Sequence, residues 1–126
     1  MAVFMGNYGE RKLDCGRIYL PERLRKILKE SGISTLYLSA QKIENFTYVR
    51  ASPELEENAI PVEIKGRRMK LPKEMRELIG LRGDEKCRLI GFFSEVQIWN
   101  AEHIRDYVGP GFTDEELKEL AKKLGI

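Results

Sequence analysis

The feature that most constrains the fold is a segment that occurs twice. Residues 14–28 read DCGRIYLPERLRKIL, and residues 65–79 read KGRRMKLPKEMRELI. Each begins with a basic, glycine-containing turn, continues to a Leu-Pro step and ends in a short amphipathic segment. Aligned on their prolines, the two segments match apolar with apolar residues: Leu20 with Leu71, Leu24 with Met75, Ile27 with Leu78 and Leu28 with Ile79. A chain of 126 residues therefore repeats one structural unit.

The repeated unit is predicted to contain a short helix between two hairpins. Its apolar residues recur at i, i+3 and i+4, and Pro21 and Pro72 suit the first turn of a helix, where a missing N–H costs nothing. Gly32 and Gly80 are expected to cap the C-termini of the two helices. Alternating apolar residues predict half-buried strands around each helix. These are residues 4–13, 17–20 and 35–49 in the first unit, and 60–64, 68–71 and 86–99 in the second.

Two such units are expected to share one core. A single unit leaves strand edges unpaired and an apolar face incompletely covered, which a second unit can correct. We therefore predict an α+β, mainly β fold with one domain over residues 1–126. Two pseudo-repeats, a first half at 1–52 and a second half at 60–108, are expected to close a small barrel. The linker 51–61 is expected to form a brief helical turn after Ser52.

Two further helices are predicted beyond the last hairpin. The first runs over residues 100–108 with Asn100 as its N-cap. The second, a C-terminal helix at 113–125, starts with a capping box from Thr113 to Glu116 and carries an apolar stripe. This stripe either covers the chain's own barrel or binds a neighbouring subunit.

Basic side chains gather around both copies of the repeated segment. Residues 11–29 and 65–76 contain 13 of the 22 lysines and arginines, although the net charge is only +2. Compensating acids lie elsewhere, at 54–57 and 114–116. Such segregation produces a positive face, which is typical of a protein that binds a polyanion. The alternative is a pair of ordinary solvated helix faces.

Glycine and arginine coincide in the turn before each Leu-Pro step. These are Gly16-Arg17 in the first half, and Gly66-Arg67-Arg68 next to Lys65 in the second. A glycine turn approaches a phosphate closely, and an adjacent arginine reaches phosphate oxygens or a guanine edge with two parallel hydrogen bonds. Alternatively, the glycine serves only the turn and the arginine is solvated. Asp14 and Glu63 precede the turns and are expected to orient the arginines through salt bridges.

Few features favour catalysis, a metal site or a membrane span. The chain contains no GxSxG, Walker-type loop, HExxH or CxxC pair, and its one histidine, His103, is expected to be solvent-exposed. Cys15 and Cys87 indicate neither a zinc site nor a disulfide framework and are expected to be reduced thiols. No apolar run approaches the ~20 residues of a membrane helix. We therefore expect a cytoplasmic protein that is not an enzyme and needs no metal or cofactor.

Four segments together resemble the MraZ family of bacterial transcriptional regulators and, more distantly, the AbrB/MazE/SpoVT type of DNA-binding domain. They are FMGNY, LDCGRIYLPERLRKIL, KGRRMKLPKEMRELIGL and RLIGFFSEVQIWNAEHIRDY. This resemblance spans nearly the whole chain. It implies a double swapped-hairpin, or double-split, β-barrel built from two AbrB-like repeats with short peripheral helices. It also implies assembly into a ring and contacts with double-stranded DNA through D-x-x-x-R loops.

The two turns supply the candidate DNA-binding residues, which are Lys12, Asp14, Arg17, Glu63, Lys65, Arg67 and Arg68. Both turns depart from the family's loop. In the first half, Asp14 and Arg17 are one position closer than the loop requires. In the second half, either Arg67, counted from Glu63, or Arg68, counted from the Leu-Pro step, takes the arginine's place.

The leading hypothesis is a sequence-specific DNA-binding regulator that acts as a homo-oligomer at repeated promoter sites of the division and cell-wall gene cluster. Such a protein would associate with the nucleoid and take no small-molecule substrate. The first alternative is an antitoxin-like AbrB/MazE-type protein that binds a partner protein through its C-terminal helix. The second is an enzyme with Cys15 as nucleophile, for which the sequence offers no evident base.

Overall fold

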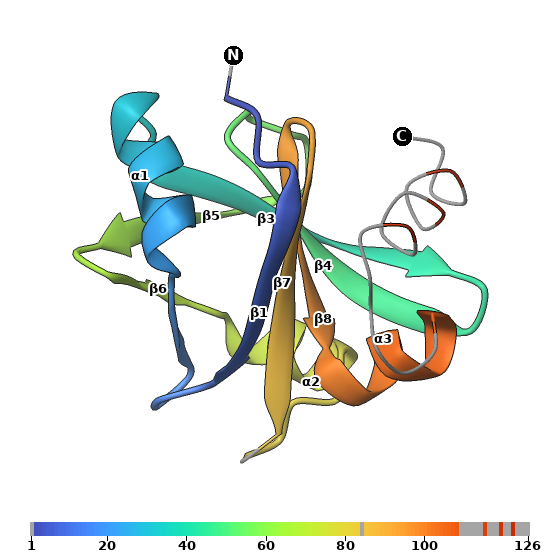
Figure 1. The fold of residues 1–126 in the computed structure, drawn as a ribbon. Helices are drawn as coiled ribbons and strands as arrows, with labels where there is room; N and C mark the ends of the chain where they lie inside the picture. The colour runs from blue at the N-terminus through green and yellow to red at the C-terminus, as the bar shows by residue number, and fades with distance from the viewer. Residues whose placement is uncertain (1, 84, 109–114, 116–118, 120–121, 123–126) are drawn as a thin grey trace.

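The fold is shown in Figure 1 by a computed structural model, which describes residues 2–83, 85–108, 115, 119 and 122. Most of the predicted C-terminal helix at 113–125, with its capping box, lies outside these residues, so that helix stays a prediction. Within the described residues, no helix is both long enough and apolar enough to cross a bilayer.

Eight strands and three short helices follow one another in the described part of the chain. In order, they are β1 (Gly6–Lys12), β2 (Arg17–Tyr19), α1 (Glu22–Glu30), β3 (Thr35–Ile43), β4 (Phe46–Ser52), β5 (Ile60–Lys65), β6 (Arg68–Lys70), α2 (Lys73–Leu78), β7 (Lys86–Phe92), β8 (Glu95–Asn100) and α3 (Ala101–Val108). The second half shows the predicted order of hairpin, helix and hairpin. In the first half, β1 and β2 lie at opposite ends of the sheet order and are joined only by an isolated bridge between Asp14 and Arg17, so the first predicted hairpin is incomplete.

Both repeated helices end before the predicted glycines and begin one residue after the prolines. Pro21 and Pro72 have φ of −57° and −54° and lie immediately before the first helical residue, one position earlier than predicted. Gly32 and Gly80 follow the helices with φ of +67° and +76°. Their N–H groups, and those of the residues after them, bond back to the last turn, as in a Schellman motif. Glycine is favoured there because it reaches positive φ without steric cost.

The strands form one antiparallel sheet that curls into a nearly closed barrel (Figure 1). Its order is β1-β7-β8-β4-β3-β5-β6-β2. Strand β1 of the first half therefore pairs with β7 of the second, and β5 of the second half pairs with β3 of the first. Each half supplies the strand that covers an edge of the other, which explains why one unit alone would leave edges open.

The two halves pair in equivalent registers. Strands β2 and β6 are centred on Ile18 opposite Met69, and β4 and β8 on Arg50 opposite Gln97. Around the Ile18–Met69 pair, each residue of the first half corresponds to the residue 51 positions later in the second half. This is the same spacing that separates Pro21 from Pro72. This register matches every residue of the first turn with one residue of the second, without an insertion.

Side chains from both halves fill a common core. Ile18 and Met69, at the centre of the β2–β6 pair, are buried together with Leu36 and Leu89. A second cluster lies under α3, where Trp99 stacks on Tyr48 with ring centroids 4.9 Å apart. Burial raises the pKa of Tyr48 to about 12. The larger cluster is thus shared by the two halves.

Two local expectations are wrong. The linker after Ser52 forms bends and a turn instead of a helical turn, because the Ser52 hydroxyl accepts a hydrogen bond from the Glu54 N–H at 3.2 Å and holds the chain in a local turn. His103 is half-buried, not exposed, since its ring contacts Phe46 at a centroid distance of 6.1 Å.

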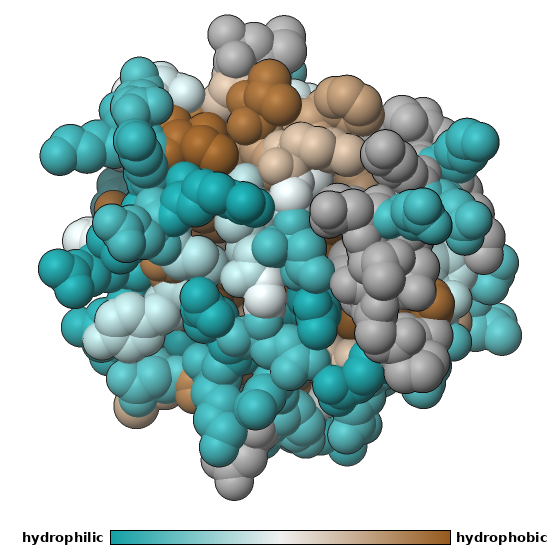
Figure 2. All heavy atoms as spheres, in the orientation of Figure 1, coloured by the Kyte–Doolittle hydropathy of each residue, from teal (hydrophilic) through white to brown (hydrophobic). Residues whose placement is uncertain are grey.

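The surface is mostly hydrophilic, with one apolar region in the face of Figure 2. Brown spheres gather at the top of this view, where Figure 1 places the N-terminus and the β7–β8 turn. Val3 and Phe93 are 58% and 51% exposed, and Met5 is also exposed. The N–H of Phe4 donates to the Phe93 carbonyl at 2.6 Å, so these apolar side chains belong to neighbouring segments.

Candidate nucleic-acid interface

The two glycine turns have the same length and correspond residue by residue. Asp14 bridges to Arg17 across the first turn, and Lys65 pairs with Arg68 across the second. Each turn therefore has two central residues. Arg68 is thus the structural counterpart of Arg17, whereas Arg67 corresponds to Gly16.

Backbone geometry explains the glycines at these turns. Cys15 and Gly16 have φ of +52° and +78°, the combination that a type I′ hairpin turn requires. In the second turn Gly66 has φ of +64°. Tight two-residue turns hold the following arginines at fixed points on β2 and β6.

Each turn is also fixed by the other half of the chain. The Leu71 N–H donates to the Gly16 carbonyl at 2.8 Å, and the Leu20 N–H donates to the Arg67 carbonyl at 2.8 Å. These two bonds occupy equivalent positions, so each Leu-Pro step secures the opposite turn. The two turns therefore form one rigid unit instead of two independent loops.

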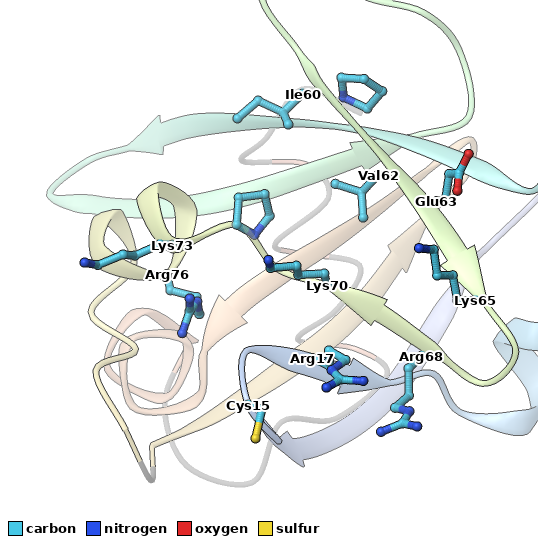
Figure 3. A pocket seen from close by; sticks show the side chains of 12 residues that line it. Cys15, Arg17, Ile60, Val62, Glu63, Lys65, Arg68, Lys70, Lys73 and Arg76 are labelled. Carbon is cyan, nitrogen blue, oxygen red and sulfur yellow. The ribbon is translucent and has the colours of Figure 1, made fainter.

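A groove of about 910 Å³ opens beside this unit (Figure 3). Its lining residues come from β2, β5, β6, α2 and the turn before β2. They are Cys15, Arg17, Ile60, Pro61, Val62, Glu63, Lys65, Arg68, Lys70, Pro72, Lys73 and Arg76. Half of them are basic and Glu63 is the one acid in this lining. Such a groove attracts anions and presents several donors to them.

Arg68 is held in place by side chains of the first half. Its guanidinium lies 5.3 Å from the centroid of the Tyr19 ring and 3.8 Å from the Asp14 carboxylate. Both contacts are partly exposed, so each contributes modestly to stability. Their main effect is orientation. Asp14 thus contacts the arginine of the opposite half, whereas the sequence pattern predicts a pairing within its own turn.

Arg17 has a different environment. The residues that correspond to Tyr19 and Asp14 on its side are Lys70 and Lys65, both basic. Like charges do not hold a guanidinium in one rotamer, and Arg17 is exposed at the start of β2. The two equivalent arginines therefore differ: Arg68 is oriented before a ligand arrives, and Arg17 is not.

The remaining predicted residues lie near the groove but not all within it. Lys65 and Glu63 line it from β5 (Figure 3). Lys12, at the end of β1, and Arg67, in the second turn, are exposed but are not part of its lining. The structure thus brings Arg17, Glu63, Lys65 and Arg68 together, with Asp14 beside Arg68.

Three basic lining residues are missing from the candidate set chosen from the sequence. Lys70, Lys73 and Arg76 belong to the same basic cluster but follow the turn instead of forming it. The sequence does indicate that two of them lie together. Lys73 and Arg76 are three positions apart on α2, and residues with this spacing lie on one face of a helix. That this face adjoins β6 depends on the tertiary structure.

Metal ligands and cysteines are the sequence features that bear on catalysis. The described residues contain no group of three His, Cys, Asp or Glu side chains able to hold a metal ion. Cys15 is exposed at the edge of the groove, but the groove lining contains no histidine. Cys87 is buried, and this burial raises the pKa of its thiol to about 11. Cys87 therefore lacks the surroundings of an activated nucleophile.

Comparison with known proteins adds no family. No protein-family model matches the chain, and no curated protein matches its sequence. The motifs and the geometry of the turns are therefore the grounds for any functional conclusion.

Proposed function

We propose that this protein is a DNA-binding regulator that contacts duplex DNA through its two basic turns and the adjoining groove. One observation carries the proposal: the two turns lock each other in place and direct Arg17, Lys65 and Arg68 to one basic groove. Arg68, which Tyr19 and Asp14 already orient, loses little entropy on binding, and the planar guanidinium groups of both arginines suit phosphate oxygens or a guanine edge. An open row of cations also matches the dense negative charge of a duplex.

We further propose that the chain is an MraZ-like protein with a double swapped-hairpin barrel. The exchange of β1 and β5 between the halves supports that fold, as does the equivalent register of the two turns. A ring-shaped homo-oligomer acting on repeated promoter sites is part of the same proposal. The exposed apolar side chains Val3, Met5 and Phe93 are candidates for contacts between subunits.

The proposal places the protein in the cytoplasm, at the nucleoid. An antitoxin-like function would depend on the tail, which lies mostly outside the described residues, so no structural observation favours it. An enzymatic function would need a base beside Cys15, and the groove lining includes no histidine to supply one.

A binding measurement tests the proposal. The Arg17→Ala, Arg68→Ala double variant removes the two equivalent arginines, and Lys26→Ala, Lys29→Ala removes the same charge from the exposed side of α1. On a mixed-sequence duplex of about 30 base pairs, the arginine variant should bind at least tenfold more weakly, with a log K against log salt slope reduced by about 2. Equal affinities and slopes for the two variants would overturn the proposal.

A further inference from the structure

The two halves carry different charges at corresponding positions around the turns. Register relates Lys12, Asp14, Gly16, Arg17, Tyr19, Glu22 and Arg25 of the first half to Glu63, Lys65, Arg67, Arg68, Lys70, Lys73 and Arg76 of the second. The first set contains three basic residues and two acids, whereas the second contains six basic residues and one acid. At these positions the second half is therefore the more cationic, although over the whole segments 11–29 and 62–80 the first half has seven basic and two acidic residues and the second has six and three.

The clearest difference lies between the equivalent residues Arg25 and Arg76. The Nε of Arg25 donates to the Leu20 carbonyl at 2.9 Å, so this arginine supports its own Leu-Pro step. The Nε of Arg76 is buried and has no hydrogen-bond partner among the described residues. Its guanidinium lies against Gly16, where an added Cβ would come within 3.0 Å of Cζ. Arg76 therefore lines the groove with a guanidinium whose Nε, unlike that of Arg25, makes no hydrogen bond to the described residues.

Two lysines lie near Arg76 along the groove, and the Nζ of one of them, Lys73, lies 4.0 Å from the Glu77 carboxylate in an exposed ion pair. Lys70 ends β6 and Lys73 begins α2, and both are exposed. Figure 3 shows them with Arg76 along the α2 side of the groove, away from Arg68. Pro72, between the two lysines, and Ile60 with Val62 on β5 give the groove an apolar component. A row of cations beside an apolar surface suits a sugar-phosphate strand. The cations can bind its phosphates, and the apolar side chains can pack against its sugars.

We propose that Lys70, Lys73 and Arg76 form a phosphate-binding row that holds one backbone strand of the duplex, so that each chain lies on DNA in one orientation. This inference rests on the proposed DNA-binding function and adds a site to it. The row fixes the chain on the DNA through phosphate contacts. Arg17 and Arg68 of the turns then contact the base edges that are exposed in a groove of the duplex. The first half cannot replace the row, since Tyr19 and Glu22 occupy the places of the lysines and Arg25 is bonded internally.

The test compares three variants on a mixed-sequence duplex of about 30 base pairs. One is Lys70→Ala, Lys73→Ala, Arg76→Ala. Its control, Lys26→Ala, Lys29→Ala, Lys42→Ala, removes the same charge from exposed sites outside the groove lining. The third is Glu22→Lys. Dissociation constants are measured from about 50 to 200 mM salt, and folding is checked by thermal unfolding.

The row variant should lose about 3 from the slope of log K against log salt, and it should weaken binding uniformly across duplex sequences. The control should lose less than 1, and Glu22→Lys should change affinity less than about twofold, because the first helix does not face a phosphate. The inference would be overturned by an unchanged slope of log K against log salt in the row variant. A slope steeper by about 1 in Glu22→Lys would overturn it as well.

The outcome also separates this inference from the proposed function. If the row variant binds as its control does while Arg17→Ala, Arg68→Ala loses affinity, the phosphate row is wrong and DNA binding through the turns stands. If the unaltered protein fails to bind the duplex at about 50 mM salt, DNA binding itself is wrong. Lys70 and Lys73 are exposed, so Lys70→Ala, Lys73→Ala provides a folded variant even if Arg76→Ala is unstable.

Discussion

In the first half, Asp14 precedes the glycine turn and Glu22 begins the helix, whereas Lys65 and Lys73 occupy these places in the second half. The backbone around them is paired in equivalent registers. Apolar spacing and turn glycines therefore specify the fold, and the exposed positions between them are free to differ. The fold does not require the cationic residues of the second half, and the proposed function assigns them to DNA binding.

The interiors of the two halves also differ. Trp99 in β8 corresponds to Ser52 in β4, counted from the Arg50–Gln97 pair, and both are buried. Gly91 in β7 corresponds to Ala40 in β3, which is exposed. The second half thus supports an aromatic cluster and the N-terminal segment in addition to the shared barrel.

Replacing Trp99 should have the largest effect on stability. The Trp99 side chain is fully buried, stacks on Tyr48 and donates its indole N–H to Gln97 at 2.9 Å. Trp99→Ala should lower the free energy of unfolding by about 4 kcal/mol, measured by urea denaturation. Ser52→Ala, at the corresponding position, should cost about 1 kcal/mol, because one turn hydrogen bond is lost. Similar losses for the two variants would contradict the difference between the two interiors.

Gly91→Ala should have the next largest effect. A Cβ at Gly91 would lie 1.6 Å from the Phe4 carbonyl oxygen, so the N-terminal segment would have to move and Phe4 would leave the core. We expect a loss of about 3 kcal/mol in the same measurement. Ala40→Val, on the equivalent strand, should change stability by less than about 0.5 kcal/mol. A Gly91→Ala protein with an unchanged urea midpoint would show that β1 and its preceding segment do not depend on this close approach.

The strands, helices and repeated turns could be predicted because local chemistry specifies them. The Leu-Pro steps and the glycines at 32 and 80 determine where α1 and α2 begin and end. The exchange of β1 and β5 between halves could not be derived from pattern alone, since it depends on which edges meet. The site shows the same division: Arg17, Lys65 and Arg68 follow from the turns, whereas Arg76 joins them only because α2 packs beside Gly16.

Truncating the two equivalent helix arginines should separate stability from binding. Arg25→Ala removes a hydrogen bond to the Leu20 carbonyl and should cost about 1 kcal/mol of stability. Arg76→Ala removes no such bond and should cost less than about 0.5 kcal/mol, yet it should weaken duplex binding more than Arg25→Ala does. Thermal unfolding and duplex titration of both variants give the comparison. The reverse ranking in either assay would contradict the assigned difference.

The two thiols provide the smallest perturbation. Cys15 is exposed in the first turn, while Cys87 is buried and holds its proton to a pKa of about 11. Near neutral pH, a thiol reagent should therefore modify Cys15 in the folded chain and reach Cys87 only after unfolding. Because Cys15 lines the groove, a bulky adduct should also reduce duplex binding, and bound duplex should slow the modification. Mass spectrometry with and without the duplex measures both effects, and rapid labelling of Cys87 in the folded chain would contradict its placement.

The most direct test of the account moves charge between the halves without changing the total. A variant with Asp14→Lys, Glu22→Lys, Lys65→Asp and Lys73→Glu exchanges the residues at two pairs of corresponding positions. Its net charge stays at +2. The account predicts that it binds a duplex at least tenfold more weakly than the unaltered protein at about 100 mM salt, because Arg76 and Lys70 lose their cationic neighbours. Unchanged affinity would show that net charge alone governs binding, and would contradict the claim that the second half holds the DNA.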